Sequence, residues 1–201
     1  MNKSKIFNKD NLLKLLIDSG LIIFSVLFAL FINEYRNSIH DDKLKYIALL
    51  NVKNELQSNL EVVNDWLPYH KEVLKNFQSA IENDSINQSV KTKEGIDFRK
   101  IMPRGVVQSL INNTSWETLK NSSVVSNLEY ESLLKLSKIY EIQNKGVQKT
   151  LDVIIEILSS REALRIESSD ETLILLRNAF AELVSQEETL IQYYEVTLEE
   201  L

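Results

Sequence analysis

The feature that most constrains this chain is an apolar run near its N-terminus, LLKLLIDSGLIIFSVLFALFIN, from Leu12 to Asn33. As an α-helix, the residues from Leu12 to Ile32 extend about 31 Å, which matches the roughly 30 Å hydrocarbon core of a bilayer. The run passes into the bulky and polar FINEYRN, without the small residues of a signal-peptide cleavage site. The pattern therefore predicts a retained transmembrane anchor at 12–32, after a short segment 1–11 and before an extramembrane domain at 33–201.

The charges that flank the run predict an orientation. Four lysines and the terminal amine lie before or at the start of the run, whereas the three cations that follow it are interspersed with three acids. The lysines are Lys3, Lys5, Lys9 and Lys14. By the positive-inside rule, we expect the N-terminus to be cytoplasmic and the large domain to lie outside. In the inner membrane of a bacterium, that side is the periplasm.

Asp18 is the unusual residue of the run, because a carboxylate in the middle of a span costs roughly 2.5–3.5 kcal/mol. In one interpretation it pairs with Lys14, one helical turn earlier. In the other it belongs to a stripe of small and polar side chains, within about 80° of the helix surface, of the kind that packed membrane helices place between them. The stripe comprises Asp18, Ser25, Ala29 and Asn33. A proton or ion pathway is a third interpretation.

Three short segments carry a family resemblance: ALFINEYRN (29–37) with an acid fifteen positions before Asn33, SWETLKNSS (115–123) and LSKIYEIQN (136–144). They resemble a family of uncharacterised single-pass bacterial membrane proteins whose span ends in A-L-x-I-N and continues into a long helix. This sequence departs from that pattern with Tyr35, where tryptophan is commoner, and Val124, where a glycine usually follows the serines. The resemblance implies a membrane anchor and an α-helical extramembrane domain, and it implies no activity.

The rest of the chain predicts an all-α fold. Four glycines and two prolines in 201 residues are too few for turn-rich folds, and apolar residues recur with 3-4 spacing from Tyr46 to Ile81. Lys53 and His70 interrupt that face, and Pro68 is expected to kink its helix. The face comprises Tyr46, Leu49, Lys53, Leu56, Leu60, Val63, Leu67, His70, Leu74, Phe77 and Ile81.

The predicted elements are a long helix at 34–82, a loop at 83–96, short helices within 97–122, and long helices at 127–165 and 170–201. Capping boxes are predicted at Thr114–Glu117, Ser126–Glu129 and Ser168–Glu171. The last helix has an apolar heptad face that Glu187 interrupts. Together these elements predict a transmembrane helix that continues into an elongated antiparallel helical bundle with coiled-coil-like packing.

The sequence offers no catalytic grouping. Cysteine is absent, and the two histidines, His40 and His70, have no cluster of further ligands nearby. We therefore predict a protein that is not an enzyme and has no cofactor or metal. The net charge of −6 and the absence of a basic patch in the domain argue against nucleic acid as a partner.

Trp116, with Lys120 one turn later, is the candidate partner contact of the domain, and core packing is the alternative for Trp116. The sequence favours a membrane-anchored helical interaction or scaffold protein. Its predicted partners are the lipid bilayer and either a second copy of the chain or another membrane protein. The alternatives are a ligand or stress sensor of the same architecture, or a membrane-perturbing effector that assembles through its transmembrane helix.

Overall fold

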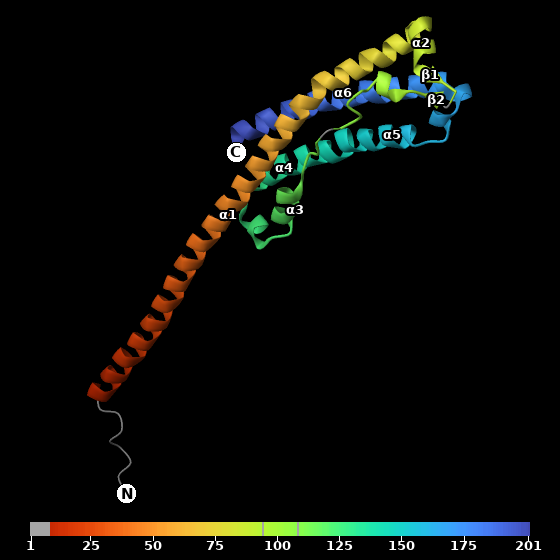
Figure 1. The fold of residues 1–201 in the computed structure, drawn as a ribbon. Coiled ribbons are helices and arrows are strands. Elements are labelled where there is room, and N and C mark those ends of the chain that lie inside the picture. Colours follow the sequence, from red (N-terminus) through yellow and green to blue (C-terminus); the bar gives the residue numbers. More distant parts are fainter. Residues whose placement is uncertain (1–8, 94, 108) are drawn as a thin grey trace. The chain divides into compact units, whose positions relative to one another are not determined.

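The computed structural model describes residues 9–93, 95–107 and 109–201, with side chains from residue 12 onward (Figure 1). The described part of the chain is mostly helical and has a single two-stranded ladder. It forms two compact units, residues 1–47 and 48–201, and each is considered by itself. The longest helix, α1 (Lys9–Glu82), contributes residues to both units. The all-α class predicted from the sequence is confirmed.

The first unit is, in its described part, the N-terminal portion of α1. The helix begins at Lys9 and includes the whole apolar run, and the side chains of residues 12–44 are exposed. The predicted segment 1–11 lies mostly outside the described residues, which begin at residue 9. No residue of the described part of this unit covers the apolar surface of the helix.

The second unit combines the C-terminal portion of α1 with several shorter elements and one further long helix. The regular elements are α2 (Asp84–Val90), β1 (Lys91–Thr92), β2 (Gly95–Ile96), α3 (Thr114–Lys120), α4 (Tyr130–Ile142), α5 (Lys149–Leu158) and α6 (Ser169–Glu200). A π-helical segment, Gln143–Gln148, joins α4 to α5. Short 3-10 turns lie at Phe98–Lys100, Ser123–Asn127, Glu162–Leu164 and Ile166–Ser168.

The contacts between side chains give the directions of the long helices in this unit. Phe77 of α1 lies against Phe180 of α6, with ring centroids 5.4 Å apart, and His70 bonds Glu187, so α6 runs antiparallel to α1. Tyr140 of α4 bonds Glu55 of α1, and Gln143, directly after α4, bonds Asn59 one turn farther along α1. Both contacts advance in the same direction, so α4 runs parallel to α1. α6 thus runs antiparallel to both α1 and α4, as predicted for the bundle, and only the pair α1 and α4 is parallel. Coiled-coil packing stays a prediction.

The buried face of α1 differs from the predicted one at seven of the eleven predicted positions. The two faces share Leu56, Val63, His70 and Phe77, which are fully buried. Between them the core takes Val52, Asn59, Trp66, Val73 and Ala80, and the predicted alternatives Leu49, Leu60, Leu67, Leu74 and Ile81 are only partly buried. Both sets have 3-4 spacing with the shared positions, so periodicity cannot choose between them. The neighbours of the helix decide which flank is covered.

The predicted loop 83–96 is wrong, because this segment folds into α2 and the β1–β2 hairpin. Asn83 caps α2: its side-chain oxygen accepts hydrogen bonds from the backbone N–H groups of Ser85 and Ile86 at 3.0 and 3.2 Å. Gly95 has a φ of 104°, which the turn of the hairpin requires and which only glycine adopts readily.

The remaining predicted boundaries need smaller corrections. The helix predicted at 127–165 begins at Tyr130 and ends at Leu158, and the short helices predicted within 97–122 are Phe98–Lys100 and Thr114–Lys120. α1 is one helix that continues through Pro68. None of the three capping boxes forms: Asn113, Glu129 and Ser168 occupy the N-cap positions and make no side-chain capping bond.

Candidate functional site

The apolar segment of α1 is the first candidate for a functional surface. It reaches a mean hydropathy of 2.5 over its most apolar window, and none of that window is buried. Leu15, Ile22, Phe24 and Phe31 each retain about 60% or more of their accessible surface. The helix is long and apolar enough to cross a membrane, a criterion that an N-terminal signal sequence also meets. In water, such a surface is far larger than the apolar patches that monomeric proteins expose.

The predicted stripe lies on this helix, and all four of its side chains are exposed. The hydroxyl of Ser25 donates a hydrogen bond of 2.7 Å to the carbonyl oxygen of Leu21, so its polarity is satisfied within its own helix. Asp18 makes neither a hydrogen bond nor an ion pair with any described residue, and Lys14 is not its partner there. The choice between Lys14 and a second helix therefore stays open.

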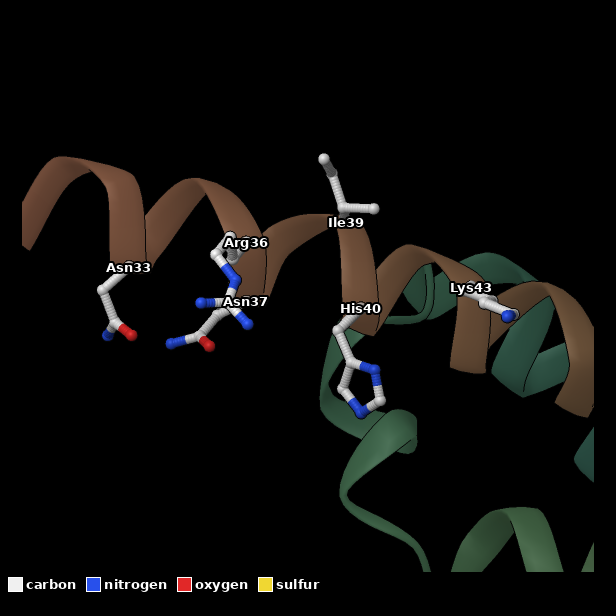
Figure 2. A pocket seen from close by; sticks show the side chains of 6 residues that line it. All are labelled: Asn33, Arg36, Asn37, Ile39, His40 and Lys43. Atoms are coloured by element: carbon white, nitrogen blue, oxygen red, sulfur yellow. The ribbon is translucent and has the colours of Figure 1, made fainter.

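Directly after the apolar segment, α1 carries a shallow hollow on its surface. It is lined by Asn33, Arg36, Asn37, Ile39, His40 and Lys43, all exposed (Figure 2). Five of these six side chains can donate N–H hydrogen bonds, and none is acidic. This surface can attract an anion, and the sequence analysis did not single it out.

In the second unit, an irregular segment returns along α1, and polar side chains of α1 bond its backbone. Asn76 donates to the carbonyl oxygen of Ile101 at 2.9 Å, and Tyr69 donates to that of Gly105 at 2.8 Å. Farther along, Asn59 both donates to the carbonyl oxygen of Asn112 at 2.6 Å and accepts from its N–H at 2.8 Å. Buried backbone groups outside regular elements need such partners, which explains the polar residues on an otherwise apolar helix.

His70 and Glu187 form a fully buried pair at the centre of this unit. Nδ1 of His70 lies 2.6 Å from Oε1 of Glu187, and Nε2 lies 2.7 Å from the carbonyl oxygen of Val106. Because a carbonyl oxygen only accepts, Nε2 carries a proton and donates it to Val106. The second proton lies between Nδ1 and Glu187, and the pair has no net charge whichever of the two holds it. Burial raises the pKa of Glu187, against the opposing effect of His70.

A second buried network joins the π-helical segment to α1 and α6. Oε1 of Gln143 accepts from the hydroxyl of Tyr194 at 2.7 Å and from the amide of Asn59 at 3.2 Å. The amide of Gln143 donates to the carbonyl oxygen of Asn112 at 3.1 Å. Burial raises the pKa of Tyr194, which keeps its hydroxyl protonated as a donor. The π-helical segment thus places the polar side chain of Gln143 in the core.

Glu55 fixes α3, and with it the predicted partner contact. Its carboxylate accepts hydrogen bonds from the backbone N–H of Ser115 at 2.7 Å, from that of Trp116 at 3.3 Å and from the hydroxyl of Tyr140 at 2.6 Å. This remote carboxylate takes the place of the predicted capping box, because it satisfies N–H groups of the first turn. Burial and the neighbouring Glu55 raise the pKa of Tyr140.

Trp116 belongs to the core. Its side chain is 4% exposed, and its ring is stacked on that of Tyr140 with centroids 5.3 Å apart. Lys120 lies with its ammonium 5.5 Å from the centre of the Trp116 ring and bonds Glu117 at 2.8 Å. An anchor of a partner contact must be exposed, so the structure supports the alternative of core packing for Trp116. Lys120 is about two-fifths exposed and covers one face of the ring.

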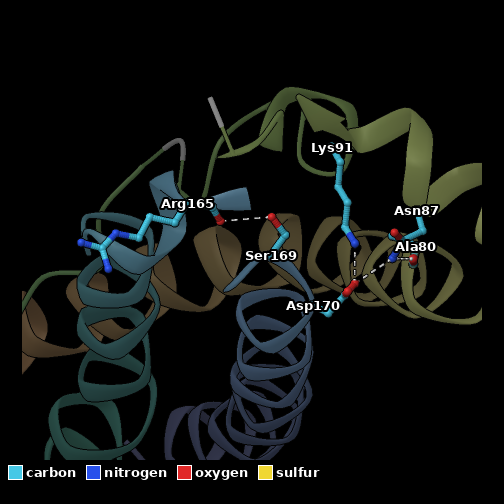
Figure 3. Close-up of polar contacts among 6 residues, drawn as sticks. All are labelled: Ala80, Asn87, Lys91, Arg165, Ser169 and Asp170. Atoms are coloured by element: carbon cyan, nitrogen blue, oxygen red, sulfur yellow. Dashed lines mark hydrogen bonds and ion pairs between the residues drawn. The ribbon is translucent and has the colours of Figure 1, made fainter. Parts of the chain in front are cut away.

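At the opposite end of the second unit, a polar cluster joins α2 and β1 to the start of α6 (Figure 3). Oδ1 of Asp170 accepts from the ammonium of Lys91 at 2.8 Å and from the amide of Asn87 at 3.1 Å. The same amide donates to the carbonyl oxygen of Ala80. The bond from Lys91, and secondarily that from Asn87, lowers the pKa of Asp170. These contacts hold the hairpin against the start of α6.

Four buried titratable side chains, His70, Glu187, Tyr140 and Tyr194, each bond a group that holds the fold. His70 is the buried histidine, and both of its nitrogens have structural partners. Among the described residues, no group of three or more histidines, aspartates and glutamates could hold a metal ion. His40 lies on the exposed surface of the first unit.

Sequence reasoning missed Glu55, Asn59 and Gln143, since a polar residue next to an apolar face is usually exposed. A signal for the His70–Glu187 pair did exist. Each residue was the polar interruption of a predicted apolar face, and two interruptions of opposite character can satisfy each other in one core.

Comparison with family models, with curated proteins and with solved structures found no match to this chain. The resemblance based on ALFINEYRN and SWETLKNSS therefore stays a prediction. What the molecule itself establishes is an all-α protein with one long, apolar and exposed helix near its N-terminus.

Proposed function

We propose that this protein is a membrane-anchored helical interaction or scaffold protein without catalytic activity. Residues 12–32 cross the bilayer once, and residues 33–201 form the extramembrane domain. The protein acts through self-association or through another membrane protein, and it needs no cofactor and binds no nucleic acid.

One observation carries this proposal: the apolar helix is exposed on every side, with 0% of its most apolar window buried. A helix that is apolar all round must be covered by lipid or by other protein. The polar contacts of the second unit support the non-catalytic part of the proposal, since Glu55, His70 and Glu187 all bond to groups that hold the fold.

The stripe supplies the proposed contact within the membrane. Asp18, Ser25, Ala29 and Asn33 share one side of the helix, and small or polar residues there allow a second helix to approach closely. A carboxylate that lacks a partner in the described chain gains most from a donor on that second helix. The proposed partner is a second copy or another single-pass protein.

The proposed location is the inner membrane of a bacterium, with the N-terminus in the cytoplasm and the domain in the periplasm. The chain has no cysteine, so single cysteines can report the side of the membrane. Ser4→Cys and Ser137→Cys are introduced separately and labelled in intact cells with a membrane-impermeant maleimide. Labelling of Ser137→Cys alone is expected, and labelling of Ser4→Cys alone would contradict the orientation.

The anchor and the contact have separate tests. Resistance of the full chain to extraction from membranes by alkaline carbonate is expected, and its release would overturn the anchor. Crosslinking in membranes then compares Asp18→Leu and Ala29→Leu, which change the stripe, with Leu27→Phe, which changes the opposite side. Loss of crosslinked oligomer in the first two variants alone supports the stripe, and unchanged oligomer in all three would refute it.

A further inference from the structure

The charges of α1 directly after the apolar segment are separated by side of the helix. At 100° per residue, Arg36, His40 and Lys43 fall within about 60° of one another and form what we call the basic stripe. The acids of the same stretch, Glu34, Asp41 and Asp42, lie at least about 100° from any member of it. This stretch has nearly equal numbers of positive and negative side chains, and one side of the helix nevertheless carries positive charges only.

The surroundings of the basic stripe suit an anion. The stripe residues line the surface hollow together with Asn33, Asn37 and Ile39, all exposed (Figure 2). No described residue forms an ion pair with Arg36 or Lys43, so neither cation is neutralised within the described chain. Guanidinium, ammonium and amide N–H groups are the donors that phosphate oxygens accept from.

The position of the stripe along the helix puts it at the depth of lipid headgroups. At 1.5 Å per residue, Arg36 and Lys43 lie about 6 and 16 Å beyond Ile32. Helical side chains lean toward the N-terminus, here toward the apolar segment, and long cations reach several ångströms farther. The interfacial layer and the reach of surface charge together extend over about the same distance.

One aromatic residue borders the stripe. Tyr35, about 5 Å beyond Ile32, and Ile39 form an adjacent apolar edge, and their side chains are 60% and 53% exposed. Tyrosine concentrates at membrane–water interfaces, where its ring contacts the acyl boundary and its hydroxyl the headgroups. Cations and a tyrosine directly after a span are placed to contact the headgroups of anionic lipids.

We propose that Arg36, His40 and Lys43 bind the phosphate of an anionic phospholipid headgroup in the leaflet next to the C-terminal end of the span. This inference rests on the proposed anchor. It adds a lipid preference that a plain hydrophobic span lacks, and it assigns the juxtamembrane hollow to a ligand.

The experiment measures lipid preference with the full chain reconstituted in phosphatidylcholine vesicles that contain phosphatidylglycerol. Spin-labelled versions of the two lipids give the ratio of their association with the protein. The matched pair is Lys43→Gln, on the stripe, and Lys45→Gln, two residues later on the opposite side, because both remove one lysine charge. Arg36→Gln combined with Lys43→Gln removes both permanent charges of the stripe.

The wild-type chain is expected to prefer phosphatidylglycerol. Lys43→Gln lowers that preference by up to about fivefold, the double variant abolishes it, and Lys45→Gln leaves it within about twofold. Equal losses in the two single variants would overturn the inference in favour of total charge, and so would a wild-type chain without preference.

Carbonate extraction separates the two proposals. A chain that resists extraction and shows no lipid preference refutes the stripe and leaves the anchor standing. A chain that carbonate releases refutes both.

Discussion

Each unit of this protein has an acid on an apolar helical surface, and the two acids differ in burial and in their partners. Glu187 of α6 is fully buried, and His70 meets it at 2.6 Å from another helix of the same unit. Asp18 of α1 lies in the apolar run 12–32, is exposed, and has no partner among the described residues. A buried acid in water-soluble protein is stable only when its own fold supplies a partner. In the proposed function, the acid of the apolar segment obtains its partner from a second helix.

The apolar residues of the two units differ in the same way. In α6 they form one stripe that faces the core, with Leu173, Phe180 and Leu190 fully buried and charged residues on the other side. In residues 12–32 of α1 they surround the helix and remain exposed. A single stripe matches a bundle of this chain's own helices, whereas a complete apolar surface matches a solvent that is itself apolar.

Removal of the partner of His70 is the test with the largest expected effect on stability. Glu187→Ala leaves a buried imidazole without its bond, and we expect a loss of about 3–5 kcal/mol in the free energy of unfolding. Denaturation followed by tryptophan fluorescence measures the second unit alone, since Trp66 and Trp116 are the only tryptophans of the chain. Glu188→Ala, which removes a half-exposed ion pair with Lys71, should cost less than about 1 kcal/mol. Equal losses of unfolding free energy in both variants would show that burial does not determine how much each pair stabilises the fold.

A smaller loss is expected from Glu55→Ala, which removes the acceptor of two backbone N–H groups and of the Tyr140 hydroxyl. We expect about 2–3 kcal/mol by the same denaturation measurement. Glu61→Ala, on the exposed side of the same helix, serves as the control and should change stability by less than about 0.5 kcal/mol. Partial recovery in Glu55→Gln, which keeps one acceptor oxygen, would identify capping as the cause.

Gly95→Ala tests the hairpin that replaced the predicted loop. Gly95 has a φ of 104°, and a Cβ there would lie 2.8 Å from the carbonyl oxygen of Ala163, so we expect a loss of about 1–3 kcal/mol. Gly105→Ala shares the positive φ, at 75°, but a Cβ there has nothing within 4 Å. Its smaller loss isolates the backbone strain from the collision. Similar losses of unfolding free energy in the two variants would mean that the Ala163 carbonyl moves away from the new Cβ without destabilising the fold.

The His70–Glu187 pair also predicts a dependence on pH. Because burial raises the pKa of Glu187, the folded chain keeps this proton at pH values where the unfolded chain has released it. The stability from this group is complete below the ordinary carboxylate pKa of about 4.3 and is lost as the pH rises through the raised value. One proton changes stability by at most about 1.4 kcal/mol per pH unit. Wild-type stability should therefore fall relative to Glu187→Gln as pH rises from 4, and parallel profiles would contradict the shift.

Asp18→Leu should have the smallest effect on stability, in contrast to the removal of Glu187. Because Asp18 has no partner in the described chain, we expect the unfolding free energy of the second unit to change by less than about 0.5 kcal/mol. A larger change, measured by tryptophan fluorescence on the full chain in detergent, would mean that the apolar segment is coupled to the domain.

Some of the site was readable from the sequence because it depends on composition along one helix. The long apolar helix, its stripe of small and polar residues and the predominance of helices follow from local periodicity and length. The partners of Glu55, Asn59 and Gln143 were not readable, because each contact joins residues at least 31 positions apart. Two faces with equal 3-4 spacing on α1 were indistinguishable until a returning segment covered one of them.

The sequence by itself determined that this chain is helical and that residues 12–32 form an apolar helix, because both properties depend on neighbours within a few turns. Only the tertiary structure decided that His70 and Glu187 meet, that α4 runs parallel to α1, and that Trp116 is buried. Those outcomes depend on long-range packing, which pairs buried polar groups such as Asn59 and Gln143 with residues from distant parts of the chain.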